Sequence, residues 1–205
     1  MLVVGKQVLT LDLLSFQTTP LVPLLTPRDW VGVAQMSKAV FAFGGSVDYS
    51  GPRTVCEKST IPPTSWTPLP PMHYARVHFT PCLFKGRFYL ASASDHRAVE
   101  SFSPLTETFT VLPVALPEDL LLVCGSVAFV TDGELILLTY NQQMARWKVE
   151  SEVCFRISAT DRKCWSLCSP LTVGTEVYIA NGSMVEKWSL EAHNFVHTPK
   201  PCALQ

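Results

Sequence analysis

The sequence predicts an all-β fold, and three observations support this prediction. The 205 residues include 16 prolines and 10 glycines, which divide the chain into many short elements. Apolar residues alternate with polar ones or form short continuous runs, as β-strands do, and no sustained helical periodicity occurs. The apolar runs come in pairs joined by a short polar break, as in VAQMSKAVFAF, HFTPCLFKGRFYLAS, CGSVAFVTDGELILL and SLCSPLTVGTEVYIA.

The polar breaks inside these pairs predict hairpin turns. Gly86, Gly133 and Gly174 lie in three of them, and a tight hairpin turn favours a residue that tolerates positive φ. We therefore expect each pair to form two antiparallel strands.

Composition excludes several classes of protein. Hydrophobic residues make up 47% of the chain and charged residues 16%, so there is enough apolar surface for a folded core. The net charge of −1 argues against a dedicated nucleic-acid binder. No apolar run approaches the roughly 20 residues that span a bilayer, so no membrane partner is expected. The apolar N-terminus contains Lys6 and Asp12 and is interpreted as β-structure rather than a signal peptide.

The seven cysteines lie mostly inside apolar runs. Free thiols in such positions behave as small hydrophobic side chains and are typical of a reducing compartment. The sequence therefore predicts a cytoplasmic location.

A repeat of about 44 residues follows the same pattern of strands. Segments that begin at Val8, Val55, Val99, Met144 and Val185 are separated by 47, 44, 45 and 41 residues. An aromatic residue lies three positions into three of the segments, and a second ring follows seven or eight positions later. The first rings are Phe102, Trp147 and Trp188, and the second rings are Trp66, Phe109, Phe155 and Phe195.

A period in this range with four strands per unit predicts a β-propeller. A four-stranded sheet cannot bury both faces alone, whereas stacked sheets bury each face against a neighbour. The second rings are expected to lie buried between successive sheets. The Gly-His and Trp-Asp dipeptides of WD40 repeats are both absent from the sequence.

The units resemble the Kelch repeat family. A double glycine ends FAFGG (Phe41 to Gly45), and Phe102 and Phe109 reproduce the family's spacing of two aromatic residues. The stretch from Trp66 to Ser92 is similar to the family's linker between blades, with Met72, Arg76 and His78 in place. Other units depart from the pattern. Ser92-Ala93, Thr139-Tyr140 and Asn181-Gly182 stand where double glycine is expected, and Ser59 replaces an aromatic residue.

The predicted fold is a single Kelch-like propeller domain, partial or irregular, with four full four-stranded blades plus an incomplete N-terminal blade. The units cover residues 1–24 (incomplete), 29–71, 74–113, 117–159 and 161–199. Aligning Val8 with Val185 places Met1 inside a second strand, so an open seam that favours self-association is also expected.

Motifs for catalysis or cofactor binding are not found in the sequence. Cys164 and Cys168 have no second ligand pair at zinc spacing, and His193 and His197 have no third ligand nearby. Nucleophile-elbow and phosphate-loop motifs are absent. The sequence therefore predicts no cofactor and no enzyme activity. The alternative is a catalytic propeller with its site in the central channel.

Binding through loops is the predicted function, because propeller loops vary freely on a rigid support. The resemblance to Kelch proteins implies a protein-interaction module of an adaptor or scaffold. Tyrosine and arginine often anchor protein interfaces. The candidate partner-binding residues are Asp48, Tyr49, Arg53, His73, Tyr74, Arg76, Asp95, His96 and Arg97. Arg76 has a competing interpretation as a structural residue bonded to backbone carbonyls.

Overall fold

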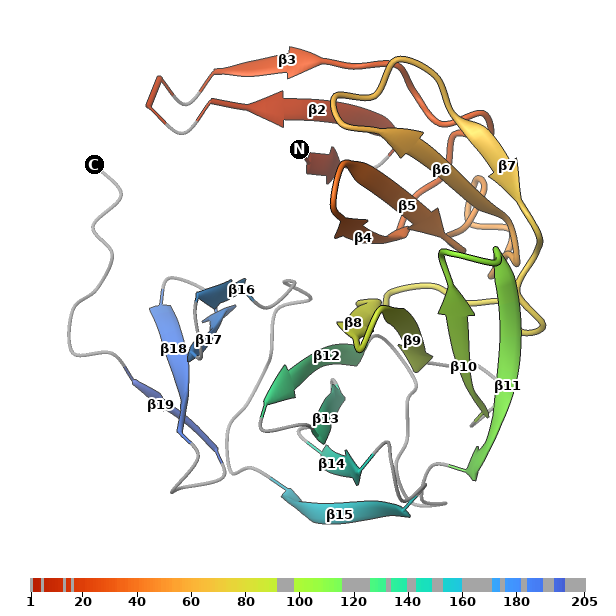
Figure 1. Ribbon diagram of the computed structural model, residues 1–205. Helices are drawn as coiled ribbons and strands as arrows, with labels where there is room; N and C mark the ends of the chain where they lie inside the picture. Colours follow the sequence, from red (N-terminus) through yellow and green to blue (C-terminus); the bar gives the residue numbers. More distant parts are fainter. Residues whose placement is uncertain are drawn as a thin grey trace.

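The computed structural model describes nineteen β-strands, and its described residues contain no helix. The described residues are 2–4, 6–12, 14–15, 17–91, 98–115, 126–131, 134–139, 143–148, 153–159, 171–173, 176–181, 184–189 and 194–197. The strands follow one another along the chain in five sheets (Figure 1). The all-β prediction is confirmed for this part of the chain.

The first sheet has three strands in the order β1-β2-β3, and each of the other four has four sequential strands. All of the strand pairs are antiparallel. The first two sheets comprise β1 (Leu2–Val4), β2 (Gln7–Leu11) and β3 (Thr18–Pro20), then β4 (Gly32–Met36), β5 (Ala39–Phe43), β6 (Cys56–Thr60) and β7 (Thr67–Leu69). The third comprises β8 (Cys82–Phe84), β9 (Arg87–Ala91), β10 (Ala98–Ser103) and β11 (Thr108–Ala115).

The last two sheets repeat this sequential order. They comprise β12 (Ser126–Thr131), β13 (Glu134–Thr139), β14 (Gln143–Lys148) and β15 (Val153–Ala159), then β16 (Leu171–Val173), β17 (Glu176–Asn181), β18 (Met184–Ser189) and β19 (Asn194–His197). Contacts between sheets join β4 to β8, β8 to β12 and β11 to β15. Each sheet therefore lies against the next one in the chain over the second, third and fourth sheets.

The hairpin between β8 and β9 shows how the sequence sets the turns. Lys85 and Gly86 have φ values of 46° and 75°, and Phe84 pairs directly with Arg87. Positive φ at both central residues matches the right-handed twist of the strands. The turn predicted at Gly86 is confirmed, whereas Gly133 and Gly174 lie outside the described residues.

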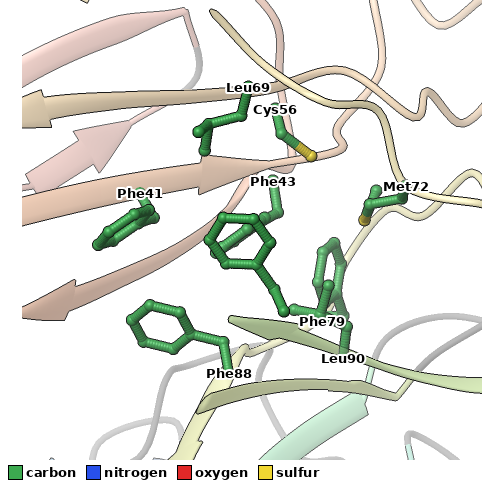
Figure 2. Packing of buried hydrophobic residues seen from close by; sticks show 9 residues of the cluster. Phe41, Phe43, Cys56, Leu69, Met72, Phe79, Phe88 and Leu90 are labelled. Carbon is green, nitrogen blue, oxygen red and sulfur yellow. The ribbon is translucent and has the colours of Figure 1, made fainter. Parts of the chain in front are cut away.

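The main core fills the space between the second and third sheets. Phe41 and Phe43 of β5 face Phe88 and Leu90 of β9 (Figure 2). Ring centroids lie 5.1 Å apart for Phe41 and Phe88 and 5.8 Å apart for Phe43 and Phe88. Aromatic pairs prefer such tilted and edge contacts, and their burial stabilises one sheet on the other.

The opposite face of β5 packs on the first sheet. Val40 and Ala42 join Val8, Leu24 and Trp66 in a second buried cluster. Side chains alternate between the two faces of a strand, so one strand supplies both clusters. The second sheet is consequently buried on both faces.

Two of the four predicted inter-sheet rings can be placed. Trp66 is buried in the second cluster, and Phe109 packs half-buried against the main core with its centroid 4.6 Å from that of Phe102. The backbone of Phe102 pairs with that of Phe109, and Trp188 pairs likewise with Phe195. The side chains of Phe155 and Phe195 lie outside the described residues. Trp147 pairs with Cys154, so the ring at Phe155 is one position beyond the equivalent site.

We expect Trp66→Phe to lower the free energy of unfolding by about 1–2 kcal/mol. The indole Nε1 donates a hydrogen bond of 3.0 Å to the carbonyl of Val22, and phenylalanine loses both this bond and part of the buried volume. Urea unfolding of the variant measures the change. Leu105→Ala is the control, because Leu105 is 92% exposed in the β10–β11 turn and its loss should change stability little. Equal stability of Trp66→Phe and the parent would contradict the prediction.

Candidate functional site

Three connections between strands meet on one part of the molecule. They are residues 21–31 after β3, 44–55 after β5 and 70–81 after β7. The amides of Asp29 and Ser46 each donate to the other's carbonyl, at 2.9 and 2.8 Å. The amide of Arg76 donates to the carbonyl of Arg53 at 3.1 Å. These bonds hold the three loops together as one backbone unit.

The double glycine lets the three loops approach each other closely. Gly44 and Gly45 follow β5 directly and have φ values of 60° and 100°. A Cβ on Gly44 would lie 2.4 Å from the carbonyl oxygen of Arg76, and one on Gly45 would lie 2.7 Å from that of Asp29. The pair therefore ends the strand at a place where a side chain would collide with the neighbouring backbone.

A buried ion pair anchors the first of the loops. Arg28 and Glu57 are 0% and 1% exposed, and Arg28 Nη1 donates to Glu57 Oε1. The same carboxylate accepts hydrogen bonds from the backbone amides of Leu25 and Thr26, at 2.7 and 3.2 Å. One buried glutamate on β6 therefore holds both an arginine and two amides of the loop before β4.

The same arrangement recurs in the loop before β8, with the arginine 48 and the glutamate 43 residues further along the chain. Arg76 Nη2 donates to Glu100 Oε1 at 3.1 Å and to the carbonyl of Ala98 at 2.9 Å. Glu100 also accepts from the backbone amides of His73 and Tyr74, at 2.9 and 3.0 Å. Burial lowers the pKa of Arg76, while the adjacent Glu100 carboxylate opposes this shift.

Arg76 thus has a structural role, and its place among the partner-binding candidates is corrected. Its side chain is fully buried, so a partner that lies on the protein surface does not reach it. Its guanidinium carbon lies 5.9 Å from the centroid of the Tyr74 ring, which joins Tyr74 to the same buried pair. The competing interpretation of Arg76 as a structural arginine is the one that agrees with its burial.

The other predicted residues that the structure describes lie on two loops. Asp48, Tyr49 and Arg53 lie exposed on the loop after β5, where Arg53 Nη2 donates to Ser50 Oγ at 2.6 Å. His73 is half-exposed, and its Nδ1 lies 2.9 Å from Glu100 Oε2, beside Tyr74. Asp95, His96 and Arg97 lie outside the described residues.

A cluster of three rings joins the three loops at the surface. We call Trp30, Tyr49 and His78 the aromatic corner. The Trp30 ring centroid lies 5.0 Å from that of Tyr49 at an interplanar angle of 71°, and 4.3 Å from that of His78. Tyr49 is 78% exposed and Trp30 is 39% exposed. Burial lowers the pKa of His78, so its ring is neutral at pH 7.

The backbone of the aromatic corner is strained. Trp30, Tyr49 and His78 have φ values of 57°, 58° and 51°, and Asp48 has one of 47°. The left-handed conformation costs a non-glycine residue roughly 1–2 kcal/mol. Such strain persists where the surrounding structure enforces it, and it clusters at ligand-binding sites. Four of the seven non-glycine residues with positive φ in the described part of the chain thus lie in the aromatic corner or next to it.

Trp30 and His78 were not among the partner-binding residues predicted from the sequence, although His78 lies in the stretch that is similar to the Kelch linker. Each lies two positions after a buried arginine, Arg28 or Arg76, and the amide of His78 donates to the carbonyl of Trp30 at 3.3 Å. The repeated spacing is visible in the sequence, but it has meaning only once the arginines are known to be buried. This offset is the signal that could have found both rings.

A similar signal marks the buried glutamates. Twenty-four positions separate Arg76 from Glu100, and the same interval separates Arg162 from Glu186 in the sequence, whereas 29 positions separate Arg28 from Glu57. In the predicted unit between those of Arg76 and Arg162, Ala145 stands at the position of the glutamate. Residues 113–125, the segment that corresponds to the one with Arg76, include no basic residue. The arginine and the glutamate are thus both present in the units of Arg76 and Arg162, and both are absent from the unit between them.

A charged pair borders the aromatic corner. Lys6, between β1 and β2, donates from Nζ to Asp48 Oδ1, and both side chains are substantially exposed. Asp48 raises the pKa of Lys6 through this bond and its charge, with smaller contributions from Asp29 and Tyr49. An ammonium group therefore lies within electrostatic range of the corner.

Two buried thiols near these loops are expected to be unreactive. Burial raises the pKa of Cys56 and of Cys82 to about 12 each, so both stay protonated at pH 8. Because the thiolate is the nucleophile, iodoacetamide should alkylate these two residues only on unfolding, where the ordinary pKa is restored. Peptide mass spectrometry after timed labelling, with and without urea, measures this. Rapid labelling of Cys56 in the folded protein would contradict the expected burial.

Comparisons with known proteins identify no family. No protein-family model matches the sequence, and no curated protein matches it at a significant level. Among the described residues there is no group of three or more side chains able to hold a metal ion. In the same part of the chain, no helix is long and apolar enough to cross a membrane.

Proposed function

We propose that this chain is a protein-interaction module built as a Kelch-like propeller, with the sheets as its blades. The chain of sequential four-stranded antiparallel sheets supports this proposal, as does the double glycine at Gly44 and Gly45. The recurrence of a buried arginine–glutamate pair at an interval of 48 residues between Arg28 and Arg76 supports it further. Repeated anchoring of this kind suits a stack of equivalent units.

The observation that carries the binding role is the aromatic corner. Three large rings lie on separate loops, all three with strained backbone, and two of them have substantial exposed area. Aromatic residues on a rigid support are the usual anchors of protein interfaces, because they combine a large area with few rotatable bonds. The proposed module binds a partner at this surface and performs no chemistry on it.

Site-specific photo-crosslinking in cells tests this function. A benzophenone amino acid at position 49 replaces the exposed Tyr49, and the same amino acid at position 105 replaces Leu105, which is 92% exposed in the β10–β11 turn. We expect a discrete crosslinked partner from position 49 and none from position 105. Trp30→Ala should reduce the yield at position 49.

The control separates specific binding from collision. The two positions are similarly exposed, so an equal pattern of crosslinks from both would contradict a binding surface at the aromatic corner. No crosslink from position 49 at any expression level would also contradict it.

A further inference from the structure

The aromatic corner has a charge environment that specifies what it binds. Asp48 is adjacent to Tyr49 in the sequence, and Asp29 is adjacent to Trp30. Lys6 Nζ is bonded to the Asp48 carboxylate, and Asp29 also raises the pKa of Lys6 through its charge, so both carboxylates act on the same ammonium group. Burial lowers the pKa of His78 and thereby favours the neutral form of its ring. Anionic groups beside exposed ring faces favour a cationic ligand.

Trp30 is well suited to stack against such a ligand. Its ring contacts both other rings of the corner and is 39% exposed, so its position is fixed while part of it faces solvent. A tryptophan face binds cations better than those of the other aromatic residues. The planar guanidinium of arginine stacks on aromatic faces and matches a carboxylate with two hydrogen bonds.

Lys6 shows that the Asp48 carboxylate accepts a cationic side chain. It comes from a different sheet from the loop that carries Asp48, yet its ammonium lies on that carboxylate with 44% of its side chain exposed. Asp48 keeps 74% of its side chain exposed in this pair. Exposed ion pairs are weak, so a ligand with better geometry can displace Lys6.

We propose that the aromatic corner and Asp48 bind an arginine side chain in an extended segment of a partner protein, and that Lys6 occupies the carboxylate when the partner is absent. The guanidinium stacks on Trp30 beside Tyr49 and bonds to Asp48, while its aliphatic stem covers the rings. This inference rests on the proposed function, because it names the chemistry by which the same surface recognises its partner.

Nuclear magnetic resonance of the full chain tests the inference with a defined probe. The probe is a capped pentapeptide with one central arginine between glycines, and its matched control carries citrulline, which has a similar shape without the charge. The Trp30→Phe variant assigns the Trp30 indole N–H signal. We expect this signal to shift saturably with the arginine peptide and not with the citrulline peptide. A lysine peptide should bind more weakly than the arginine peptide.

Three variants resolve the contributions. Asp48→Asn should weaken arginine binding roughly two- to fivefold, and Lys6→Ala should strengthen it by a similar factor. Lys58→Ala is the control, because Lys58 pairs with Glu107 on another part of the surface and should leave the affinity unchanged. All of the altered side chains are at least partly exposed, so the variants should fold.

The outcomes separate this inference from the proposed function. Equal shifts with the arginine and citrulline peptides, no saturable shift, or an affinity unaffected by Asp48→Asn would each overturn the arginine site. If position 49 crosslinks a partner while the arginine peptide leaves Trp30 unshifted, the interaction role stands and the arginine inference is wrong. If the peptide binds as expected but position 49 crosslinks nothing, the arginine site is supported and the interaction role is contradicted.

Discussion

Replacing Glu100 by glutamine is expected to lower the free energy of unfolding by about 3–5 kcal/mol. Glu100 and Arg76 are both fully buried, and their charges compensate each other at 3.1 Å. Glutamine keeps the shape but leaves the guanidinium without a counter-charge inside the protein. It also provides only one oxygen to accept the hydrogen bonds that the backbone amides of His73 and Tyr74 donate to the two carboxylate oxygens of Glu100. Urea unfolding followed by circular dichroism measures the loss.

An exposed pair provides the matched control for this variant. Lys58 and Glu107 form an ion pair whose side chains are 37% and 39% exposed. Solvent screens such a pair, so Glu107→Gln should lower stability by less than about 1 kcal/mol. Similar losses for the two glutamine variants would show that the Glu100 carboxylate is not anchoring the loop in solution.

Gly44→Ala is expected to destabilise the chain by roughly 3–5 kcal/mol, in the upper range of single substitutions. The left-handed backbone at φ 60° contributes about 1–2 kcal/mol of this. The remainder comes from the collision of the new Cβ with the carbonyl oxygen of Arg76, 2.4 Å away. A backbone oxygen can move only if the loop that carries it moves. Thermal or urea unfolding measures the change.

Gly86→Ala separates the two causes. Gly86 has a φ of 75°, but a Cβ there would have no atom within 4 Å. Its substitution should therefore cost only the conformational part, about 1–2 kcal/mol. If Gly44→Ala is no more destabilising than Gly86→Ala, then the loops are not packed as closely at the double glycine as the structure shows.

Much of the strand pattern could be predicted from local sequence. The hairpin around Gly86 and the end of β5 at Gly44 depend on residues adjacent in the chain, and a glycine requirement is visible directly. The continuous apolar run Ala39–Phe43 likewise predicts a strand buried on both faces, as found for Phe41 and Val40. Local patterns of this kind were sufficient for the all-β class.

The site was less accessible to this reasoning. Tyr49 was predicted because it is an aromatic residue in a loop, but Trp30 and His78 reach it from loops far away in the chain. Their contact depends on tertiary packing, and the two-residue offset from Arg28 and Arg76 has meaning only once those arginines are known to be buried. Arg76 shows the opposite error. A charged residue in a linker suggests exposure, and its burial becomes understandable only with Glu100 opposite it.

The base of the loop after β5 has a consequence for protein engineering. The isolated bridge between Ser46 and Pro52, together with the bond from the Arg53 amide to the Gly45 carbonyl at 2.9 Å, closes a stem beneath residues 47–51. The tip beyond this stem includes Gly51, around which a Cβ would find no atom within 4 Å. The tip is consequently a suitable position for grafting a foreign peptide in place of residues 47–51, an exchange that would also replace Asp48 and Tyr49.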